Sequence, residues 1–535
     1  MQTFYTDIKS RLDQEEKYRD LLFRRNFLIS ERSFDSQSYP FYGKWNKHSL
    51  GQYTVMIHPK EHVYFASEVT SAYHLALFGH AWNPYTEVID ETVIAKELLD
   101  RYLNDKNDFY NLLDALTGIF VIVVEHNGAL YVVQDCSGPI AIFFGKIKGE
   151  VVLGSSPQLI ADLYHLGFDK DAERLMDSKG YKRGSGFLPG NLTPYKELKR
   201  LGCNTELIYD NSTYHIRRFF PREQCVAIGS DEEKQQVVSQ MAWLMTKNIE
   251  LALKKWERLS LSLSGGIDSG TEFACANHHY DELYVFSFAS KDSELIDAHA
   301  AAEICQKLGV THHFYQIPKN NEEIEDYDFL AKLIEHNNFY ASKIHPNEKR
   351  KFIYLEQKND FDAELKGDVS EIGRAYADRK YYKVKLPRTL TARHMTITQG
   401  RYFFEPWEMR FADNAFSSFL EETDLTHDLF GYTMHDLCYW EIRMGSWAAT
   451  GYNMQCIMHQ IVMIYNNRNL MKLFLRFPKK ERASDIPHLW IMKKANPEFA
   501  KVHSQVKDSY FGFKRMFLET VYYYYSTRLN TLGSN

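Results

Sequence analysis

The stretch Leu261-Ser262-Leu263-Ser264-Gly265-Gly266-Ile267-Asp268-Ser269-Gly270 passes within ten residues from a short apolar strand pattern to a glycine turn. Residues 237–256 before it and 271–278 after it have helical spacing, which places the glycines at a strand-to-helix turn. Such a turn directs backbone N–H groups and the positive helix end toward an anion. The two glycines let a ligand approach the backbone, Ser264 and Ser269 offer hydroxyl donors, and Asp268 offers a metal ligand. The stretch therefore predicts a phosphate-binding loop.

The type of phosphate chemistry follows from the pattern of this loop. It contains no G-x-x-x-x-G-K-[ST], so transfer of a γ-phosphate is disfavoured. The pattern S-G-G-x-D-S resembles the pyrophosphate loop of ATP pyrophosphatases, which cleave ATP between the α and β phosphates. A tight glycine turn capped by a serine is the structural alternative.

Composition sets limits on the rest of the molecule. The chain has 535 residues, enough for two or three domains, with 44% hydrophobic and 25% charged residues. No apolar run approaches the roughly 20 residues of a membrane helix. The net charge of −6 disfavours nucleic acid as a partner, and seven scattered cysteines predict neither disulfides nor a zinc site. We therefore expect a cytoplasmic protein without a membrane or nucleic-acid partner. The tyrosines at 522–525 predict packing against another domain or subunit, and a homodimer is one expectation.

Helix and strand patterns in the sequence divide the chain into three parts. Residues 1–40 form an N-terminal extension with a charged helix over 8–25. Residues 41–228 carry strand patterns at 53–57, 118–125, 129–135, 140–145 and 151–155, and one helix at 92–103, as in antiparallel sheets. Ser230 and Glu233 form a capping box that opens the third part, 229–535. There, a strand at 284–289 and a helix at 296–308 predict a parallel sheet with its ligand at the carboxyl ends of the strands.

Several further motifs connect these parts to a known family. The loop, Phe286-Ser287-Phe288, Asp297-Ala298 and Leu308-Gly309 before His312-His313 resemble the synthetase domain of the asparagine synthetase family, which includes β-lactam synthetases and lasso-peptide cyclases. Segments 116–120, 134–139, 153–156 and 192–194 are similar to its amidotransferase-type domain. The resemblance implies an α/β protein: an N-terminal α+β amidotransferase-like (Ntn-type) sandwich, then a parallel-sheet ATP-pyrophosphatase domain with a helical C-terminal part.

The first domain departs from the family pattern at its nucleophile. Glutamine-using members begin, after Met1 is removed, with a cysteine whose amine and thiol attack glutamine. Here the start is Met1-Gln2-Thr3-Phe4, and no cysteine precedes Cys136. We therefore expect a scaffold domain without glutaminase activity, in which the segment Gly79-His80-Ala81-Trp82-Asn83 has a structural role.

A second acidic segment complements the glycine loop. Lys366-Gly367-Asp368-Val369-Ser370-Glu371-Ile372-Gly373-Arg374 resembles the family's second signature, a glycine-rich turn ending in an acidic residue. Matching Gly367 to its first glycine makes Glu371 a Mg²⁺ ligand together with Asp268. Asp368 then lies where a carboxylate would hold or deprotonate a small external amine. A solvated acidic loop is the alternative.

Other site residues follow from the resemblance. Glu441, in an E-x-R segment, is a candidate for acid–base work or amine recognition, the alternative being an exposed helix glutamate paired with a nearby arginine. Lys493 or Lys494 would stabilise negative charge in the transition state, and only one of the two can face the site on a helix. The segment Tyr465-Asn466-Asn467-Arg468 is either a polar site wall or a helix C-terminus. Leu263, Ser287 and Phe288 would lie near adenosine, and Ser264, Gly265, Gly266 and Ser269 around the pyrophosphate.

The implied reaction uses ATP and Mg²⁺ to adenylate a small-molecule or peptide carboxylate, and an amine or ammonia then forms an amide and releases AMP. Three alternatives stay open. A tRNA-thiolating pyrophosphatase shares the loop, although the acidic balance opposes it. A β-lactam or lasso-type cyclase would form the amide within one molecule. A non-catalytic protein would keep only the fold.

Overall fold

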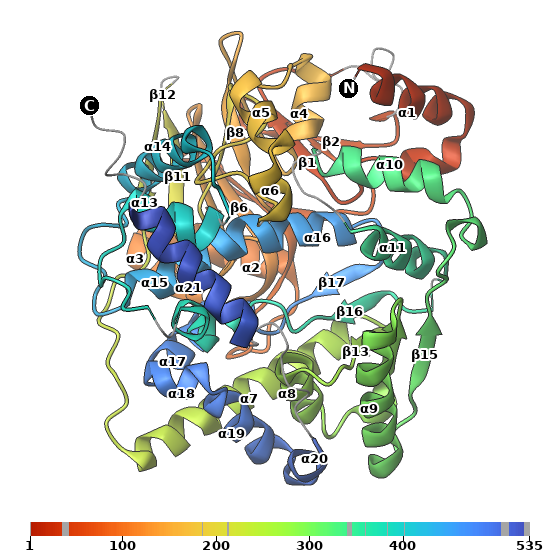
Figure 1. Ribbon diagram of the computed structural model, residues 1–535. Coiled ribbons are helices and arrows are strands. Elements are labelled where there is room, and N and C mark those ends of the chain that lie inside the picture. The colour runs from red at the N-terminus through yellow and green to blue at the C-terminus, as the bar shows by residue number, and fades with distance from the viewer. Residues whose placement is uncertain are drawn as a thin grey trace.

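A computed structural model describes residues 2–34, 42–184, 186–210, 213–339, 345–358, 360–381, 384–400, 402–503 and 513–528. Within these residues the strands form two antiparallel sheets from the first part of the chain and one parallel sheet from the second. In Figure 1 the antiparallel strands lie in the upper half, and the parallel strands β13 to β17 lie below and to the right. The predicted fold class is therefore confirmed.

Each antiparallel sheet has six strands. The first, in the order β10-β8-β9-β1-β3-β2, contains Leu198–Arg200, Phe143–Ile147, Glu150–Gly154, Phe27–Ser30, Tyr53–Ile57 and Asn46–Leu50. The second, in the order β12-β11-β7-β6-β5-β4, contains Thr213–Arg218, Thr205–Asp210, Ala129–Gln134, Thr117–His126, Tyr73–Trp82 and Val63–Glu68.

The two sheets pack face to face through apolar side chains. The rings of Phe27 on β1 and Phe78 on β5 stack with centroids 4.0 Å apart, and both side chains are fully buried. Helices α2 (Glu91–Asn104) and α3 (Lys106–Ala115) lie against the second sheet, and α4 (Pro157–Tyr164) follows β9 on the first. Two short helices, α5 (Lys170–Asp177) and α6 (Lys179–Arg183), complete this part. The result is a two-layer sandwich, as the family resemblance implies, built from the antiparallel sheets that the alternating strand patterns predict.

The N-terminal extension differs from its prediction. The helical pattern at 8–25 forms two elements, α1 (Gln2–Gln14) and the 3₁₀ helix η1 (Glu16–Leu21). After them the chain enters the first sheet as β1, between β3 and β9. The Asn337 side chain, at the end of α10 (Tyr327–Asn337), accepts a hydrogen bond from the backbone N–H of Phe23 at 3.0 Å, so the extension also packs on the second part of the chain.

The parallel sheet has the order β15-β14-β13-β16-β17, with strands His313–Gln316, Tyr284–Ala289, Leu259–Ser262, Ala363–Leu365 and Gln460–Val462. The chain passes from β13 outward to β14 and β15, then returns to the other side of β13 with β16. Strand order therefore reverses between β13 and β16. In open parallel sheets this reversal is where ligands bind, at the carboxyl ends of the strands.

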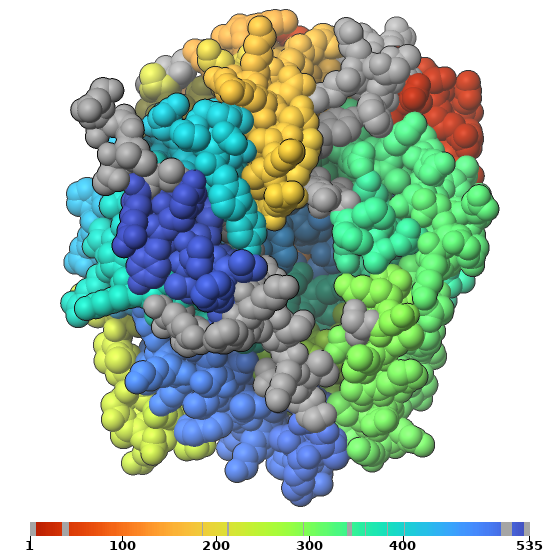
Figure 2. All heavy atoms as spheres, viewed as in Figure 1, coloured from red at the N-terminus to blue at the C-terminus, as the bar shows by residue number. Residues whose placement is uncertain are grey.

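Helices surround this sheet and make up most of the C-terminal part. They are α7 (Asp231–Lys255), α8 (Ile267–Cys275), α9 (Asp292–Leu308), α10 (Tyr327–Asn337), α11 (Pro346–Lys358), α12 (Tyr376–Lys380), α13 (Ala392–Met395), α14 (Pro406–Thr423), α15 (Met434–Cys438), α16 (Ala449–Gln455), α17 (Arg468–Leu475), α18 (Lys479–Ala483), α19 (Ile486–Ala495), α20 (Pro497–Val502) and α21 (Phe513–Arg528). Single turns of 3₁₀ helix occur at η3 (Tyr280–Glu282), η4 (Asn321–Glu323) and η5 (Ser370–Arg374), and π-helical turns at η6 (Thr396–Gly400) and η7 (Tyr439–Ala448). Figure 2 shows one face of the molecule, hollowed between α5–α6 in gold and α10–α11 in green.

Two features of this part bear on the expectations from sequence. Tyr522 and Tyr523 of α21 are buried with Tyr381 and Ile397, so half of the tyrosine cluster packs within the chain, whereas Tyr524 and Tyr525 are exposed. A bilayer-spanning helix, which must be both long and apolar, does not occur in the described part of the chain.

Candidate functional site

The glycine loop joins β13 to α8 as its sequence predicts. Strand β13 ends at Ser262, and α8 begins at Ile267 with Gly266 as its N-cap. The hydroxyl oxygens of Ser264 and Ser269 lie 3.0 Å apart, and the Gly266 N–H donates to the Ser264 Oγ at 3.2 Å. The loop thus places two hydroxyls beside the N-terminus of a nine-residue helix, an arrangement suited to phosphate oxygens.

The second loop lies directly against the first. Strand β16 pairs with β13, and the chain leaves β16 into Lys366 and Gly367. A Cβ on Gly367 would lie 2.9 Å from the Asp268 Cβ and 3.1 Å from the Ser269 nitrogen, so only glycine allows this approach. Two residues that frame the next turn, Val369 and Ala375, have positive φ angles of 81° and 47°. This backbone strain is typical of functional loops and holds the acidic turn against α8.

The two loops enclose a cavity of about 310 Å³. Ten residues predicted from sequence line it: Leu263, Ser264, Gly266, Asp268, Ser269, Ser287, Phe288, Gly367, Asp368 and Glu371. Gly265 does not line the cavity. Its backbone N–H donates a hydrogen bond to the carboxylate of Asp297, and Asp297 does line the cavity. The structure thus brings the two predicted motifs together at the reversal point of the sheet.

One side of the cavity fits the predicted nucleoside position. The Ser287 hydroxyl at the end of β14 donates to the Leu263 carbonyl at 2.6 Å, and His312 Nε2 lies 2.9 Å from the same hydroxyl. The Phe288 ring borders the cavity, with the Lys351 ammonium 4.8 Å from its centroid. An apolar ring edged by backbone and hydroxyl groups is suited to a planar base.

The acidic side of the cavity contains carboxyl groups in close proximity. Burial, followed by the charges of Asp268 and Asp368, raises the pKa of Glu371 to about 8. Burial also raises the pKa of Asp368. The buried Glu371 Oε2 has no hydrogen-bond partner among the described residues. Carboxylates that repel one another beside a phosphate cradle fit a divalent cation, which would relieve the repulsion.

A cation here would need help from the ligand. Within the described ranges, no group of three or more His, Cys, Asp and Glu side chains is arranged to hold a metal ion. Mg²⁺ usually takes one or two protein carboxylates together with phosphate oxygens and waters. Asp268 and Glu371 therefore suffice for a cation bound with pyrophosphate.

Asp268 is also engaged by protein groups. The Arg374 Nη1 donates to Asp268 Oδ2 at 2.8 Å, and the Ser370 hydroxyl donates to Oδ1. On its other side Arg374 donates through Nε to Asp485 Oδ1 at 2.8 Å. Sequence shows Arg374 only as an unusual residue in the motif, whereas the structure makes it the partner of a predicted metal ligand.

Two lysines at the cavity were not predicted as site residues. Lys366 and Lys351 both line it. Lys366 forms an ion pair with the fully buried Glu364, whose other oxygen lies 2.5 Å from His459 Nε2. Burial alone would raise the pKa of Glu364, but Lys366 and His459 lower it to about 2. Lys366 could have been noticed as the residue after a buried strand, whereas Lys351 on α11 has no local signal.

Glu272 is a third unpredicted residue, one helical turn beyond Asp268. Its side chain is fully buried, and neither carboxyl oxygen has a hydrogen-bond partner among the described residues. Burial and the nearby Asp368 and Asp268 raise its pKa far above the usual range. This buried carboxyl lies on α8, the helix that begins at the glycine loop.

Three predicted catalytic residues lie elsewhere. Lys493 and Lys494 are exposed on α19 and do not line the cavity, because α19 packs on α8 through Met492, beneath Gly270. Glu441 is fully buried in η7, where Arg218 donates to both of its oxygens at 2.6 and 2.9 Å. The arginine pairing of the alternative is present, but Glu441 is buried instead of exposed, and its carboxylate faces β12 instead of the cavity.

The segment 465–468 is not a helix C-terminus, and its Tyr465 hydroxyl donates to the Asp268 carbonyl of the glycine loop at 3.3 Å. Asn467 caps the N-terminus of α17, and its amide donates to the Ala115 carbonyl at 2.8 Å. Asn466 accepts from the Ser137 hydroxyl at 2.8 Å. These side chains join the C-terminal part to the antiparallel sandwich.

One family model matches part of the C-terminal region. Residues 242–344 match the family model of asparagine synthase. This range contains the glycine loop and ends before the second loop. The match supports an enzyme of the ATP-dependent, amide-forming carbon–nitrogen ligases in general. No curated protein sequence matches the chain.

Three solved structures are similar in part. Glutamine-dependent NAD⁺ synthetase from Acinetobacter baumannii in complex with ADP has 17% identity and a TM-score of 0.20, over 35% of this chain and 33% of that one. The allosteric regulatory enzyme of purine biosynthesis has 9% identity and a TM-score of 0.24, over 59% and 87%. Glutamine phosphoribosylpyrophosphate amidotransferase from B. subtilis, with ADP and GMP, has 10% identity and a TM-score of 0.21, over 59% and 88%. The chain thus spans about a third of the NAD⁺ synthetase.

Proposed function

We propose that this protein is an AMP- and pyrophosphate-forming amide ligase that adenylates a carboxylate and transfers the acyl group to ammonia or a small amine. The observation that carries the proposal is the contact between the two loops. Gly367 approaches so closely that a Cβ there would lie 2.9 Å from the Asp268 Cβ, and this contact sets the acidic turn beside the serine hydroxyls. A phosphate cradle and carboxylates on one wall suit an ATP cut at the α–β bond.

In the first half-reaction, a substrate carboxylate oxygen attacks the α-phosphorus and pyrophosphate leaves. The Ser264 and Ser269 hydroxyls and the N-terminus of α8 bind the departing phosphates. Lys366 and Lys351 border the same cavity and replace Lys493 and Lys494 as the cations that offset the developing negative charge. Arg374 holds the Asp268 carboxylate in position through two hydrogen bonds, at 2.8 and 3.2 Å.

Asp268 and Glu371 would hold Mg²⁺ on the pyrophosphate, where the ion would neutralise phosphate charge. The chain's own carboxylates also position the amine. In the second half-reaction the amine nitrogen attacks the acyl carbon, AMP leaves, and the amine proton passes to a carboxylate. Asp368 lines the cavity, and burial raises its pKa, which strengthens it as a proton acceptor.

We also propose that nitrogen arrives as free ammonia or amine. A glutaminase of this family needs a free amine beside a thiol. Here η1 precedes β1 in the fold, so the nitrogen of the first residue of β1 is part of a peptide bond and is not a free amine. Cys136 and Cys203 of the sandwich are buried, and burial raises the pKa of both thiols. Thiols of this kind are poor nucleophiles.

The test is pyrophosphate release from ATP and Mg²⁺ across a panel of carboxylates and amines. Asp268→Ala should lose release, whereas Asp292→Ala, a matched change at a largely exposed aspartate on α9, should keep it. Glutamine should not replace ammonia, and no glutamate should form. Absence of release with every pair, together with no ATP binding by calorimetry, would leave only the scaffold alternative.

A further inference from the structure

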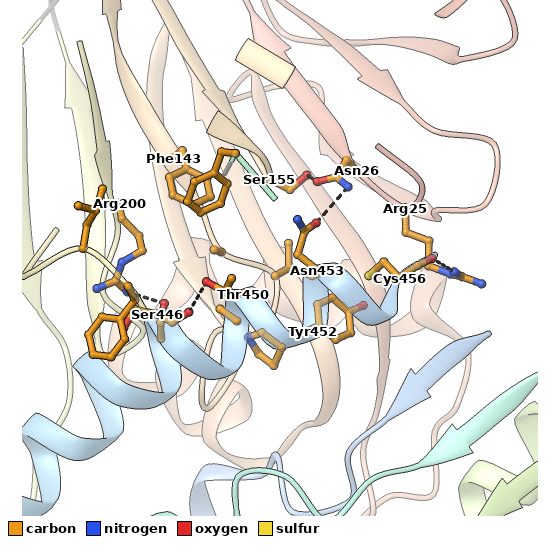
Figure 3. A pocket seen from close by; sticks show the side chains of 18 of the residues that line it. Arg25, Asn26, Phe143, Ser155, Arg200, Ser446, Thr450, Tyr452, Asn453 and Cys456 are labelled. Atoms are coloured by element: carbon orange, nitrogen blue, oxygen red, sulfur yellow. Dashed lines mark hydrogen bonds between the residues drawn. The ribbon is translucent and has the colours of Figure 1, made fainter. Parts of the chain in front are cut away.

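A second cavity lies between the antiparallel sandwich and helix α16. It encloses about 40 Å³ and shares no lining residue with the cavity at the glycine loop. In Figure 3 Arg200, Ser446 and Thr450 lie at one end, and Asn26, Ser155 and Asn453 at the other. Nothing in the proposed ligase reaction uses this space.

Arg200 determines the chemistry of the cavity. It is the last residue of β10, the edge strand of the first antiparallel sheet. Its side chain is 5% exposed, and its guanidinium donates to the Gly445 carbonyl at 2.5 Å and to the Gly190 carbonyl at 2.7 Å. Among the described residues no carboxylate forms an ion pair with it. Burial lowers the pKa of Arg200 to about 10. Carbonyl oxygens satisfy two of five N–H donors but leave the buried positive charge uncompensated, which is costly.

The rest of the lining carries no negative charge. No described aspartate or glutamate lines the cavity, and the guanidinium of Arg25, which also borders it, donates to Gln460 Oε1 at 3.2 Å and to the Met458 carbonyl at 3.1 Å. The amide and hydroxyl groups there are largely occupied with one another, since Ser155 donates to Asn26 at 2.9 Å and Thr450 donates to the Ser446 carbonyl at 2.7 Å. Phe143, Phe187 and Leu188 make the intervening walls apolar.

We propose that this cavity binds a small organic monocarboxylate, with its carboxylate on Arg200 and its apolar body between the phenylalanine rings. A planar guanidinium matches a carboxylate with two parallel hydrogen bonds. One water requires roughly 10–15 Å³ of such space, so the cavity holds only about three to four water-sized groups, which is the size of a ligand such as propionate. ATP and nucleotide-sized molecules are too large for it.

The test compares two probes of equal shape, propionate and propionamide, without ATP or Mg²⁺. The outcome is therefore independent of the ligase proposal. Propionate should bind the full-length protein in calorimetry and raise its melting temperature above that in sodium chloride of equal concentration. Propionamide should bind at least tenfold more weakly. Equal binding of the two probes, or binding of neither, would overturn the proposal.

Two variants locate the bound propionate. Arg200→Met keeps the side-chain length and should weaken propionate binding at least tenfold. Ala449→Leu, at a buried position of the lining, leaves Arg200 intact and should abolish binding by filling the space. If Arg200→Met fails to fold, Ala449→Leu decides the question alone. Propionate binding to folded Ala449→Leu at wild-type affinity would show that the cavity is not the site.

Discussion

At the scale of single residues, the buried, acidic surroundings of Glu371 make the free energy of unfolding depend on pH. Its pKa in the folded protein is about 8, raised by burial and by Asp268 and Asp368, above a usual value of 4.5. Between these two values the folded state keeps a proton that the unfolded chain loses. The free energy of unfolding therefore falls as pH rises through this window.

We expect Glu371→Gln to remove this contribution. Between pH 5 and pH 8 the wild type should lose about 1–3 kcal/mol more stability than the variant, after discounting for solvent near the cavity. Urea unfolding at pH 5, 6, 7 and 8 measures the difference. Glu294→Gln is the matched control in the same cavity, because burial is outweighed by hydrogen bonds from Ser290 and by Lys291, which together lower the pKa of Glu294. Parallel slopes for wild type and Glu371→Gln would contradict the assignment.

Gly367 gives the second prediction at this scale. Alanine there would force the two loops apart, because its Cβ would lie 2.9 Å from the Asp268 Cβ and 3.1 Å from the Ser269 nitrogen. Gly367→Ala should cost about 1–3 kcal/mol of stability and reduce pyrophosphate release at least a hundredfold. Gly167→Ala, where a Cβ meets nothing within 4 Å, should leave both unchanged. Full activity of Gly367→Ala would show that the loop contact is dispensable.

Residues in the two loops were predictable from sequence, because backbone geometry demands glycine and small polar side chains in contiguous patterns. Remote side chains were not. Lys351 reaches the cavity from α11 only through tertiary packing, and Glu441 has the pattern of a site residue but faces Arg218. A partner 223 residues away cannot be inferred from local spacing.

At the scale of elements, periodicity located β3, β6, β7, β8, β9, β13 and β14 to within a few residues, and the other described strands were not predicted. The strand expected at 284–289 is β14, and the strand expected at 53–57 is β3. The strand expected at 140–145 begins at Phe143 instead, after the turn that contains Gly138 at a φ of 68°. Strand β1 was missed, because four buried residues between charged segments carry no alternation.

Arg374 joins three elements and supplies the prediction at this scale. From η5 it donates to Asp268 on α8 and to Asp485, which precedes α19. Arg374→Met would leave Asp268 without its cation and Asp485 with Arg379 alone, so we expect a loss of about 3–5 kcal/mol and of nearly all pyrophosphate release. Arg374→Lys should recover part of the stability but little activity, because an ammonium cannot bridge both partners.

Arg379 provides the comparison for Arg374. It reaches Asp485 at 3.3 Å, but no ion pair joins it to Asp268 among the described residues. Arg379→Lys should therefore lower stability slightly and leave pyrophosphate release within about twofold of wild type. Equal losses of activity in Arg374→Lys and Arg379→Lys would show that the bridge to Asp268 is unimportant.

At the scale of the whole molecule, polar side chains of the C-terminal part are buried in the sandwich. Arg468 is fully buried and pairs with Asp114 of α3 at 3.1 Å, while its Nη2 donates to the Asp135 carbonyl at 2.9 Å. The sequence marked 466–468 as polar but could not show which surface they meet. Such contacts depend on how the parts dock, which neither periodicity nor composition encodes.

Variants of the Glu441–Arg218 pair test whether Glu441 stabilises the contact between the two parts of the chain or takes part in the reaction. Both side chains are buried, so Glu441→Gln leaves a guanidinium without its counter-ion and should lower the free energy of unfolding by about 3–5 kcal/mol. The double variant Glu441→Leu with Arg218→Met should recover most of that loss. Glu498→Gln, which breaks an exposed pair with Lys501, should change stability by less than about 0.5 kcal/mol. Urea unfolding gives these values, and pyrophosphate release per folded molecule should stay at the wild-type level in all three. If Glu441→Gln lost pyrophosphate release without lowering the free energy of unfolding, Glu441 would instead take part in the reaction, as its sequence pattern predicted.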